Sequence, residues 1–220
     1  MLTDKKTIVF TFASQAAEAG LVIGSQGNLS MRFRDESGVE LVAITPSGIN
    51  YNYLQVEDIV IINMEGSLLE GKNKVSIEKG MHLSVYAQRQ DIHAIVHFHS
   101  IFTSVLAIAG MGIPPLLDEQ VFYLGGKIGV ASHAMPGSEK LAGNVVQALG
   151  SNNAVIMANH GALTTGEDMG RAFFNAQLLD RLAQAYVYAK LLKKTKRLSG
   201  TAVEEELREH QLGELKIRRS

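Results

Sequence analysis

The sequence of 220 residues contains no cysteine. This absence excludes disulfide bonds and metal sites with thiolate ligands, so a metal in this chain must be held by histidine and carboxylate side chains. It also gives no indication of an oxidising compartment, and we expect a cytoplasmic protein. An excess of charge of either sign is missing too, because the formal net charge is −1 at pH 7. Without a long-range field, neither nucleic acid nor an anionic membrane is expected as a partner.

Long apolar runs are also absent. The N-terminal segment MLTDKKTIVFTFASQAAEAG places two lysines before an apolar run, but Ser14, Gln15 and Glu18 interrupt it. No stretch is long enough to span a bilayer, and we predict neither a signal peptide nor a membrane span. With 46% hydrophobic and 20% charged residues, and no repeat or low-complexity segment, the chain is expected to form one large domain around a sizeable core.

Helical and strand patterns alternate along the chain. Strict alternation in NLSMRFR is typical of a strand, and the turn DESG joins it to a partner strand. The same reasoning predicts strands at 28–34, 39–44, 58–63, 94–98, 128–131 and 154–158, and helices at 3–19, 78–89, from 100, from 136 and 168–193. Residues 1–195 are therefore expected to form a single α/β (α+β) domain. Residues 196–220 are expected to form a charged C-terminal tail that ends in a short solvated helix.

The stretch AIVHFHS carries two histidines in a run that otherwise reads as a buried strand. Because side chains alternate along a strand, His97 and His99 point to one side while Val96 and Phe98 point to the other. Protonation of either imidazole disfavours protonation of the other, whereas two neutral imidazoles converge readily on a divalent cation. The pair therefore indicates a metal site.

Two other segments contain polar residues that a core would not require. MANHGAL places His160 directly after an apolar strand, and VSIEKGMH places Glu78 at the start of a helix with His82 one turn further on the same face. A lone buried histidine is usually a satisfied core residue, and His160 taken alone is about as easily a core residue as a ligand. A third histidine and a carboxylate would nevertheless complete a tetrahedral site suited to Zn²⁺ and tolerable for Mn²⁺ or Co²⁺. The absence of an H-E-x-x-H motif argues against a metalloprotease.

Three short loops have the composition of an anion site. GSQGNLS, TPSG and KVS are rich in Gly, Ser, Thr and Asn, and each lies beside an expected element. Backbone N–H groups and hydroxyls in such turns can bind an anion without lysine or arginine. Any one of these loops alone is more often an ordinary turn.

The order of these motifs carries a resemblance. Over residues 3–195 the chain resembles the class II aldolase/adducin family, through Gly27-Asn28-Leu29-Ser30, Thr45-Pro46-Ser47-Gly48, Ser76-x-Glu78 with His82, His97-x-His99 and Asn159-His160-Gly161. The resemblance implies a catalytic domain with a central, mainly antiparallel β-sheet flanked by helices. It also implies a cyclic homotetramer with active sites between subunits, and one Zn²⁺ per subunit, for which Mn²⁺ or Co²⁺ could substitute.

The same resemblance assigns roles to individual residues. The implied metal ligands are Glu78, His97, His99 and His160, and the implied phosphate pocket consists of Ser25, Asn28, Ser47, Gly48 and Ser76.

Two positions depart from the family's aldolases or align less directly with them. Ile77 replaces a second serine before the glutamate, which removes a hydroxyl from the phosphate pocket. The tyrosine that supplies a proton from a neighbouring subunit aligns with Asp118, with Glu119 and Tyr123 as rivals in the same loop. No tyrosine follows Tyr188 in the tail, where those aldolases have another contributor.

The implied activity is that of a carbon–carbon lyase. Such an enzyme reversibly cleaves a ketose 1-phosphate, such as fuculose 1-phosphate or a related deoxyketose 1-phosphate, into dihydroxyacetone phosphate and an aldehyde through a zinc-stabilised enediolate. Glu78, released from the metal, would transfer the proton at C3. Alternatives are an epimerase, decarboxylase or dehydratase acting on a sugar phosphate through the same enolate, or a non-catalytic adducin-like module. Four converging ligands argue against the module.

Overall fold

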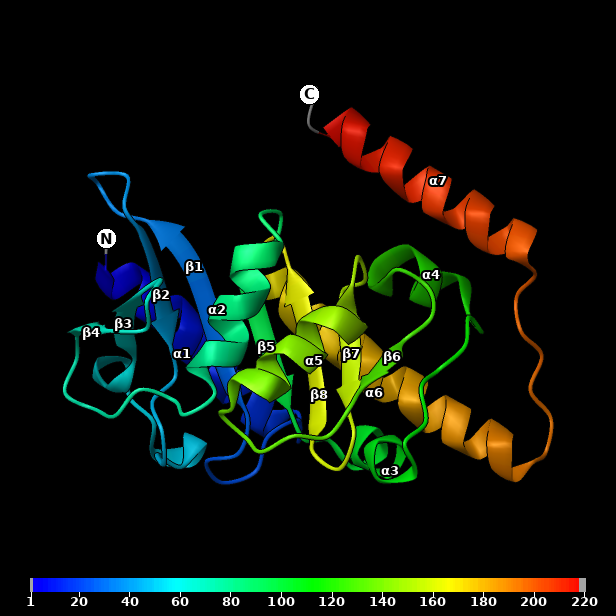
Figure 1. Cartoon of the computed structure of the whole chain (residues 1–220), viewed down its shortest axis with the longest axis horizontal. Helices are drawn as coiled ribbons and strands as arrows, with labels where there is room; N and C mark the ends of the chain where they lie inside the picture. The colour runs from blue at the N-terminus through cyan, green and yellow to red at the C-terminus, as the bar shows by residue number, and fades with distance from the viewer. Residues whose placement is uncertain (1, 218–220) are drawn as a thin grey trace.

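The computed structural model describes residues 2–217 of the chain and the side chains of residues 2–209 (Figure 1). Its elements are, in chain order, α1 Leu2–Glu18, β1 Asn28–Arg34, β2 Glu40–Ile44, β3 Val60–Asn63, β4 Leu68–Glu70, α2 Lys79–Gln88, β5 Ala94–Phe98, α3 Ile101–Ala109, α4 Asp118–Leu124, β6 Gly129–Ala131, α5 Glu139–Leu149, β7 Ala154–Met157, β8 Gly161–Gly166, α6 Met169–Leu191 and α7 Gly200–Ile217. Short 3₁₀ turns lie at Tyr51–Tyr53 and Val56–Asp58.

The strands form one eight-stranded sheet in the order β4-β3-β2-β1-β5-β8-β7-β6. Neighbouring strands are antiparallel except β6 and β7, which run parallel because α5 connects them. The expected single-domain fold with a mainly antiparallel sheet is thereby confirmed. In the centre of the sheet, His97 of β5 lies opposite Asn28 of β1 on one side and opposite Leu163 of β8 on the other.

Helices cover both faces of the sheet. Figure 1 shows α2 and α5 in front of it, while α1 and α6 lie behind and α3 lies beyond the end of β5. Side chains that alternate along each strand contribute to two separate apolar cores, one on each face of the sheet. Val96 and Phe98 of β5 join the apolar cluster beneath α1, α3 and α6, while Ile95 joins the cluster beneath α2 and α5. His97 shares the face of Ile95, so it points toward the α2 side.

Several sequence predictions agree with these elements to within one or two residues at each end. The helix expected from residue 136 is α5, which begins after Ser138, whose side chain accepts a hydrogen bond from the Leu141 amide at 3.2 Å. The long helix expected at 168–193 is α6, capped by Asp168, whose carboxylate accepts from the Arg171 amide at 2.7 Å. None of the helices within residues 2–217 combines the length and the apolar character that crossing a membrane requires.

Three elements were not expected from the sequence. The strand β8 has the sequence GALTTG, which contains two glycines and two threonines and shows no alternation. It is buried on both faces between β5 and β7, so its position in the sheet, and not its side-chain pattern, makes it a strand. The residues of the short α4 were expected to form a loop, and no element was predicted for the edge strand β4.

The C-terminal tail also differs from expectation. In place of a short helix it carries α7, which has 18 residues and packs against α4 (Figure 1). The preceding linker is tied to the domain where the Leu198 amide donates to the Pro115 carbonyl at 3.0 Å. A domain boundary near residue 195 stays a prediction, and residues 218–220 lie outside the described part of the chain.

Candidate metal centre

His97 is the fully buried centre of the site. It lies on β5, the central strand next to β1 and β8. Its Nδ1 lies 2.9 Å from the carbonyl oxygen of Ala162, which can only accept, so Nδ1 carries the proton and donates. This bond fixes the tautomer and leaves the Nε2 lone pair directed toward the other histidines.

His99 and His160 approach His97 from two different turns. His99 follows the end of β5, and its Nε2 lies 3.0 Å from Nε2 of His97. His160 sits in the tight turn between β7 and β8, where Asn159 adopts a positive φ of 56°. The next residue, Gly161, lets this turn approach β5, because a Cβ there would stand 2.6 Å from the Phe98 carbonyl oxygen. The three rings have centroids 4.7 to 5.1 Å apart.

Glu78 brings a carboxylate to this group from the N-terminus of α2. Its side chain is buried, with Oε2 at 3.2 Å from Nε2 of His97 and Oε1 at 3.3 Å from Nε2 of His160. The residue is the N-cap of α2, but its side chain makes no capping hydrogen bond. The carboxylate is therefore turned away from its own helix and toward the histidines.

These residues fit a divalent cation. Ligand atoms of His97, His99 and His160 lie within 4.8 Å of one another. The Oε1 atom of Glu78 is buried and has no hydrogen-bond partner, which is costly unless a cation or proton occupies the space before it. Three imidazoles and one carboxylate make a donor set of borderline hardness, typical of Zn²⁺ sites and acceptable for Mn²⁺ and Co²⁺.

Burial and proximity set the charge state of the group. Burial raises the pKa of the Glu78 carboxyl, but the contacts with His97 and His160 and the hydrogen bond from Asn28 outweigh this effect, so the pKa lies well below its ordinary value. Burial lowers the pKa of His99 to about 3, and the neighbouring His97 contributes. Burial, again with a contribution from His97, also lowers the pKa of His160. An ionised carboxylate beside neutral imidazoles is the state that metal binding requires.

Asn28 lies closer to the metal centre than its assignment to a phosphate pocket suggested. Its Nδ2 donates to Oε2 of Glu78 at 2.8 Å, and its Oδ1 accepts from Nε2 of His82 at 2.5 Å. Both polar atoms of the side chain are thus engaged with protein groups, and a phosphate contact by this residue stays a prediction.

The other residues expected to bind phosphate lie on loops that the fold brings together. Pro46 forms an isolated β-bridge with Val75, and the amide of Ser47 donates to the Lys74 carbonyl at 2.8 Å. The third loop is joined through Tyr51, whose amide donates to the Gly24 carbonyl at 2.8 Å and whose hydroxyl donates to the Gly27 carbonyl at 3.0 Å. Within these loops, Ser25 and Gly48 are exposed, Ser47 is half-buried and Ser76 is buried.

Ile77 lies between buried Ser76 and buried Glu78, with 66% of its own surface exposed. The loop between β6 and α5 approaches it closely, since a Cβ on Gly137 would stand 2.8 Å from the Ile77 carbonyl oxygen. The same loop carries Met135, which is 71% exposed. An apolar side chain thus lies open to solvent beside the residues expected to hold phosphate.

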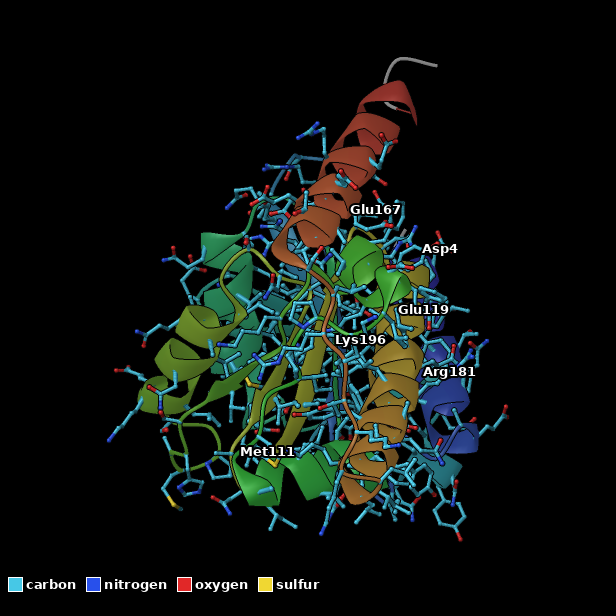
Figure 2. The ribbon with its side chains drawn as sticks, turned by 90° about the vertical axis from the view of Figure 1, so that its right-hand side faces the viewer. Asp4, Met111, Glu119, Glu167, Arg181 and Lys196 are labelled. Atoms are coloured by element: carbon cyan, nitrogen blue, oxygen red, sulfur yellow. The ribbon has the colours of Figure 1, made fainter. Side chains whose placement is uncertain are left out.

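The residues considered as proton donors lie at the other end of the sheet from the histidines. Asp118 and Glu119 are exposed in the first turn of α4. The C-terminal end of α4 meets the start of β7, where the Asn153 amide donates to the Leu124 carbonyl at 3.0 Å, whereas His160 follows the end of β7. In Figure 2, Glu119 of α4 lies well above Met111, which follows α3. Within one chain, none of these groups reaches the metal centre.

Tyr123 is held in an aromatic group on the same end. Its ring centroid lies 4.9 Å from that of Phe174, and the Arg171 guanidinium lies 5.0 Å from the Tyr123 centroid.

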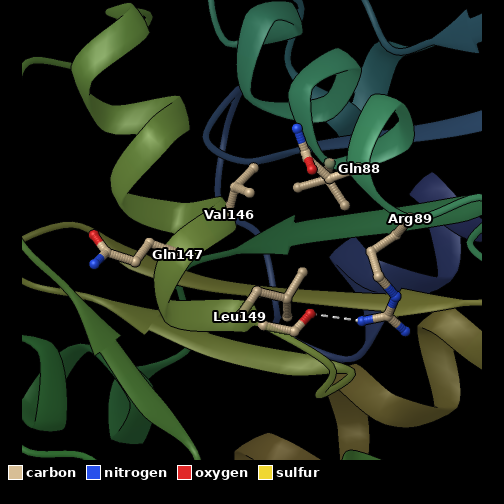
Figure 3. A pocket seen from close by; sticks show the side chains of 7 residues that line it. Gln88, Arg89, Val146, Gln147 and Leu149 are labelled. Atoms are coloured by element: carbon tan, nitrogen blue, oxygen red, sulfur yellow. Dashed lines mark hydrogen bonds between the residues drawn. The ribbon is translucent and has the colours of Figure 1, made fainter.

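A separate hollow of about 290 Å³ lies between the C-terminal ends of α2 and α5 (Figure 3). Arg89 is the charged residue in its lining. The Arg89 guanidinium is already engaged, with the Gly150 carbonyl at 2.9 Å, the Asn152 carbonyl at 3.0 Å and the Asp91 carboxylate at 2.7 Å. We therefore assign no ligand to this hollow.

Comparison with known proteins agrees with this geometry. Residues 8–187 match the family model described as the class II aldolase and adducin N-terminal domain. The 5-deoxy-D-ribulose 1-phosphate aldolase of Bacillus thuringiensis serovar kurstaki is 32% identical over 198 residues, which cover 90% of this chain and 91% of that protein.

Two further matches bear on function. The 3-oxo-tetronate 4-phosphate decarboxylase of Haemophilus influenzae is 32% identical over 192 residues, covering 84% of this chain and 89% of that protein. A solved structure of an L-fuculose 1-phosphate aldolase superposes with a TM-score of 0.88 at 31% identity, covering 94% of this chain and 96% of the other.

Proposed function

The chain belongs to the class II aldolase and adducin family, and from this premise we propose that it is a metal-dependent aldolase acting on a sugar phosphate. The reaction is the reversible cleavage of a ketose 1-phosphate, such as fuculose 1-phosphate or a related deoxyketose 1-phosphate, into dihydroxyacetone phosphate and an aldehyde. One observation carries this proposal: a histidine on β5, one just after β5 and one in the β7–β8 turn converge with Glu78 from the start of α2. The lack of cysteine leads us to place the enzyme in the cytoplasm.

The proposed cofactor is one Zn²⁺ per subunit, held by His97, His99, His160 and Glu78, with Mn²⁺ or Co²⁺ as substitutes. A bound divalent ion would supply a Lewis acid for the negative charge that develops on the substrate when its C3–C4 bond breaks. The protein's own part is to present three neutral nitrogen ligands and one carboxylate that can leave the ion.

Glu78 is proposed to handle the proton at C3. In cleavage, the C4 hydroxyl loses its proton, the electron pair of the C3–C4 bond stays with the C1–C3 fragment, and C3 gains a proton. In condensation, Glu78 removes that proton from dihydroxyacetone phosphate. Its Oε2 is held by Asn28, while Oε1 has no protein hydrogen bond and is free to accept a proton.

The three adjoining loops are proposed to hold the phosphate group. Ser25, Ser47, Gly48 and Ser76 would contribute turn amides and hydroxyls, and Asn28 belongs to this set by resemblance. No lysine or arginine is needed for such a site, because backbone N–H groups in turns already provide a positive local field.

The proton that completes the reaction at C4 is proposed to pass through a neighbouring subunit. Asp118, with Glu119 and Tyr123 as rivals, lies at the end of the sheet away from the histidines, so it can reach a metal centre only in another copy of the chain. A four-fold cyclic ring repeats one such contact until it closes. Light scattering at micromolar concentration is expected to give the mass of a tetramer, and a monomer would contradict this part of the proposal.

The activity is tested by incubating metal-loaded protein with a panel of ketose 1-phosphates and measuring release of dihydroxyacetone phosphate. The reverse reaction is followed with dihydroxyacetone phosphate and short aldehydes. Glu78→Gln is expected to keep the fold and to lose turnover in both directions. A metal-loaded wild-type protein that neither cleaves nor condenses any member of the panel would overturn the aldolase proposal.

A decarboxylase is the second candidate, favoured by the similarity to the Haemophilus influenzae enzyme. Loss of CO₂ from a 3-oxo acid phosphate leaves the electron pair of the broken bond on the carbon next to the ketone, which is an enolate, so the same ligands and the same Glu78 would serve both reactions. Release of CO₂ from such an acid, without release of dihydroxyacetone phosphate from any ketose 1-phosphate, would decide for this candidate.

A further inference from the structure

A chain of buried polar side chains runs from Glu78 away from the metal centre. The Asn28 amide links Glu78 to His82, whose Nδ1 lies 2.6 Å from the hydroxyl of Ser30. The Ser30 hydroxyl in turn lies 2.7 Å from that of Tyr86. His82, Ser30 and Tyr86 have no exposed surface, and none of the roles assigned above uses them.

These polar side chains meet because α2 faces β1 and the spacing of the residues along the helix is close to their spacing along the strand. His82 and Tyr86 are four residues apart on one face of α2, which corresponds to about 6 Å along the helix. Asn28 and Ser30 are two residues apart on one face of β1, which corresponds to about 6.6 Å along the strand. His82 therefore lies between Asn28 and Ser30, and Tyr86 meets Ser30. In Figure 1, α2 lies over β1 and β5.

Arg32 anchors the far end of this chain. Its guanidinium lies 5.2 Å from the centroid of the Tyr86 ring and donates to the Tyr86 carbonyl at 3.0 Å. It also donates to the Ile92 carbonyl at 2.6 Å, in the connection that leads into β5. Arg32 thus joins the far end of this set of side chains to the backbone of α2 and to the connection into β5.

The donors and acceptors along the chain have a definite direction. An ionised Glu78 only accepts, so the amide nitrogen of Asn28 must face it and the amide oxygen must face His82. That oxygen also only accepts, so Nε2 of His82 must carry the proton. A neutral His82 then has a bare Nδ1, which accepts from the hydroxyl of Ser30. Burial lowers the pKa of His82 to about 3, which agrees with a neutral ring.

We propose that His82 is a positioning residue for Glu78. Its Nε2–H holds the amide of Asn28 in the orientation that donates to Oε2 of Glu78 and leaves Oε1 directed toward the histidines. The opposite tautomer would require the amide to turn and place its oxygen against the carboxylate, where two acceptors repel. The proposal rests on the proposed function, because it assumes that Glu78 is a ligand and a proton carrier.

Two substitutions separate this role from simple packing. His82→Gln keeps an N–H donor near the place of Nε2, whereas His82→Met fills the space without a donor. Val85→Ala on the same helix, also buried, is the control for a loss of packing in α2. Metal affinity is measured by competition with a chelator, and the visible spectrum of the Co²⁺-loaded protein reports whether Glu78 coordinates.

The expected results follow from the hydrogen-bond direction. His82→Met weakens metal binding about 10-fold or more and changes the Co²⁺ spectrum in the same direction as Glu78→Gln. His82→Gln restores affinity to within about three-fold of wild type, and Val85→Ala changes neither the affinity nor the spectrum. An unchanged affinity and spectrum in His82→Met would overturn the proposal.

A double-mutant cycle tests whether His82 acts through Asn28. In the Asn28→Ala background, His82→Met is expected to cause no further loss of metal affinity, because the link to Glu78 is already broken. If the loss of metal affinity in the double variant equals the product of the two single losses, His82 acts independently of Asn28, and the proposal is overturned. A wild-type protein that binds no metal would instead overturn the proposed function.

The tautomer is tested without metal. In metal-free protein labelled with ¹⁵N-histidine, the resonances absent from His82→Gln are those of His82, and they are expected to show a protonated Nε2 and a bare Nδ1. The reverse assignment would overturn the proposal even if the protein proved to be an active aldolase.

Discussion

The two faces of the central sheet are made from the same strands but differ in what they bury. On the face toward α1, α3 and α6, Leu29, Val96 and Phe98 join one apolar cluster. On the face toward α2, the residues that alternate with them include Asn28 and His97, which are buried and polar. Because side chains alternate along a strand, a residue of the apolar core and a residue of the metal centre can be direct neighbours in the chain. Next to His97, both neighbours in the chain serve the core.

The buried polar residues on the α2 face are also the more costly ones. Buried polar groups lose hydration, so each needs a partner, and Asn28 has one at each of its polar atoms. The apolar face needs only close packing. Substitutions should therefore differ in kind: those of the buried polar residues on the α2 face affect metal and activity, and those on the apolar face toward α1, α3 and α6 affect the free energy of unfolding.

The largest expected effect comes from His97→Ala. We expect loss of bound divalent metal and of activity to background, with the fold retained, because this substitution removes the ligand at the centre of the cluster. Metal analysis and circular dichroism measure the two properties. Val96→Ala is the control from the opposite face and should keep its metal. Full zinc occupancy in His97→Ala would break the distinction between the faces.

Leu29→Ala tests the apolar face. Leu29 is fully buried next to Asn28, and its truncation is expected to lower the free energy of unfolding by about 2–5 kcal/mol. Chemical denaturation followed by circular dichroism measures this change. Under conditions in which the variant is folded, its metal content should equal that of wild type. A large loss of metal from folded Leu29→Ala would mean that the two faces are not independent.

The pH dependence of stability tests the neutral histidine beneath α2. Burial lowers the pKa of His82 to about 3, with a smaller lowering by His97 and an opposing effect of Glu78, whereas an unfolded histidine titrates near 6.5. Between these values the unfolded chain binds a proton that the folded chain does not, so the free energy of unfolding falls as the pH falls. The contribution of the neutral His82 ring to the free energy of unfolding is fully present above about pH 6.5 and is lost as the pH falls toward 3.

This contribution is measured by denaturation of metal-free protein at several pH values. Removing His82 should reduce the change in the free energy of unfolding with pH by up to about 1.4 kcal/mol per pH unit. His82→Gln should therefore lose less stability in acid than wild type does. The contributions of His99 and His160 are common to both proteins and cancel in the difference. Equal slopes for the two proteins would mean that His82 is not held neutral.

Ile77→Ser is expected to have the smallest effect. Ile77 is exposed between buried Ser76 and buried Glu78, and we expect a serine there to add one hydrogen bond to a bound phosphate, worth about 0.5–1.5 kcal/mol. The expected result is a KM for a ketose 1-phosphate that is several-fold lower with a nearly unchanged kcat. Preference of the wild-type protein for an unphosphorylated ketose would contradict a phosphate pocket at this place.

Local sequence patterns predicted the histidine pair and most of the helices and strands. The two-residue spacing of His97 and His99 predicted a shared side of the chain, and their Nε2 atoms are 3.0 Å apart. Apolar periodicity also predicted most of the helices and strands, because each amphipathic element carries its own signal over a few turns or pairs of residues. The strand β8 escaped prediction, since its sequence has no alternation and only its neighbours make it a strand.

Other features were decided by the tertiary structure. Asn28 is 50 residues from Glu78 and 54 residues from His82 in the sequence, so a local sequence pattern could not predict that it hydrogen-bonds to both. The sheet register that places Asn28 opposite His97, and the crossing of α2 over β1, bring these residues together. By itself, the sequence determined which side chains can bind a metal and which faces are apolar, because composition and periodicity are local. The family resemblance named Glu78 as the carboxylate, but only the fold decided which residues orient it, because hydrogen bonds between distant residues form only after the chain has closed the loops between them.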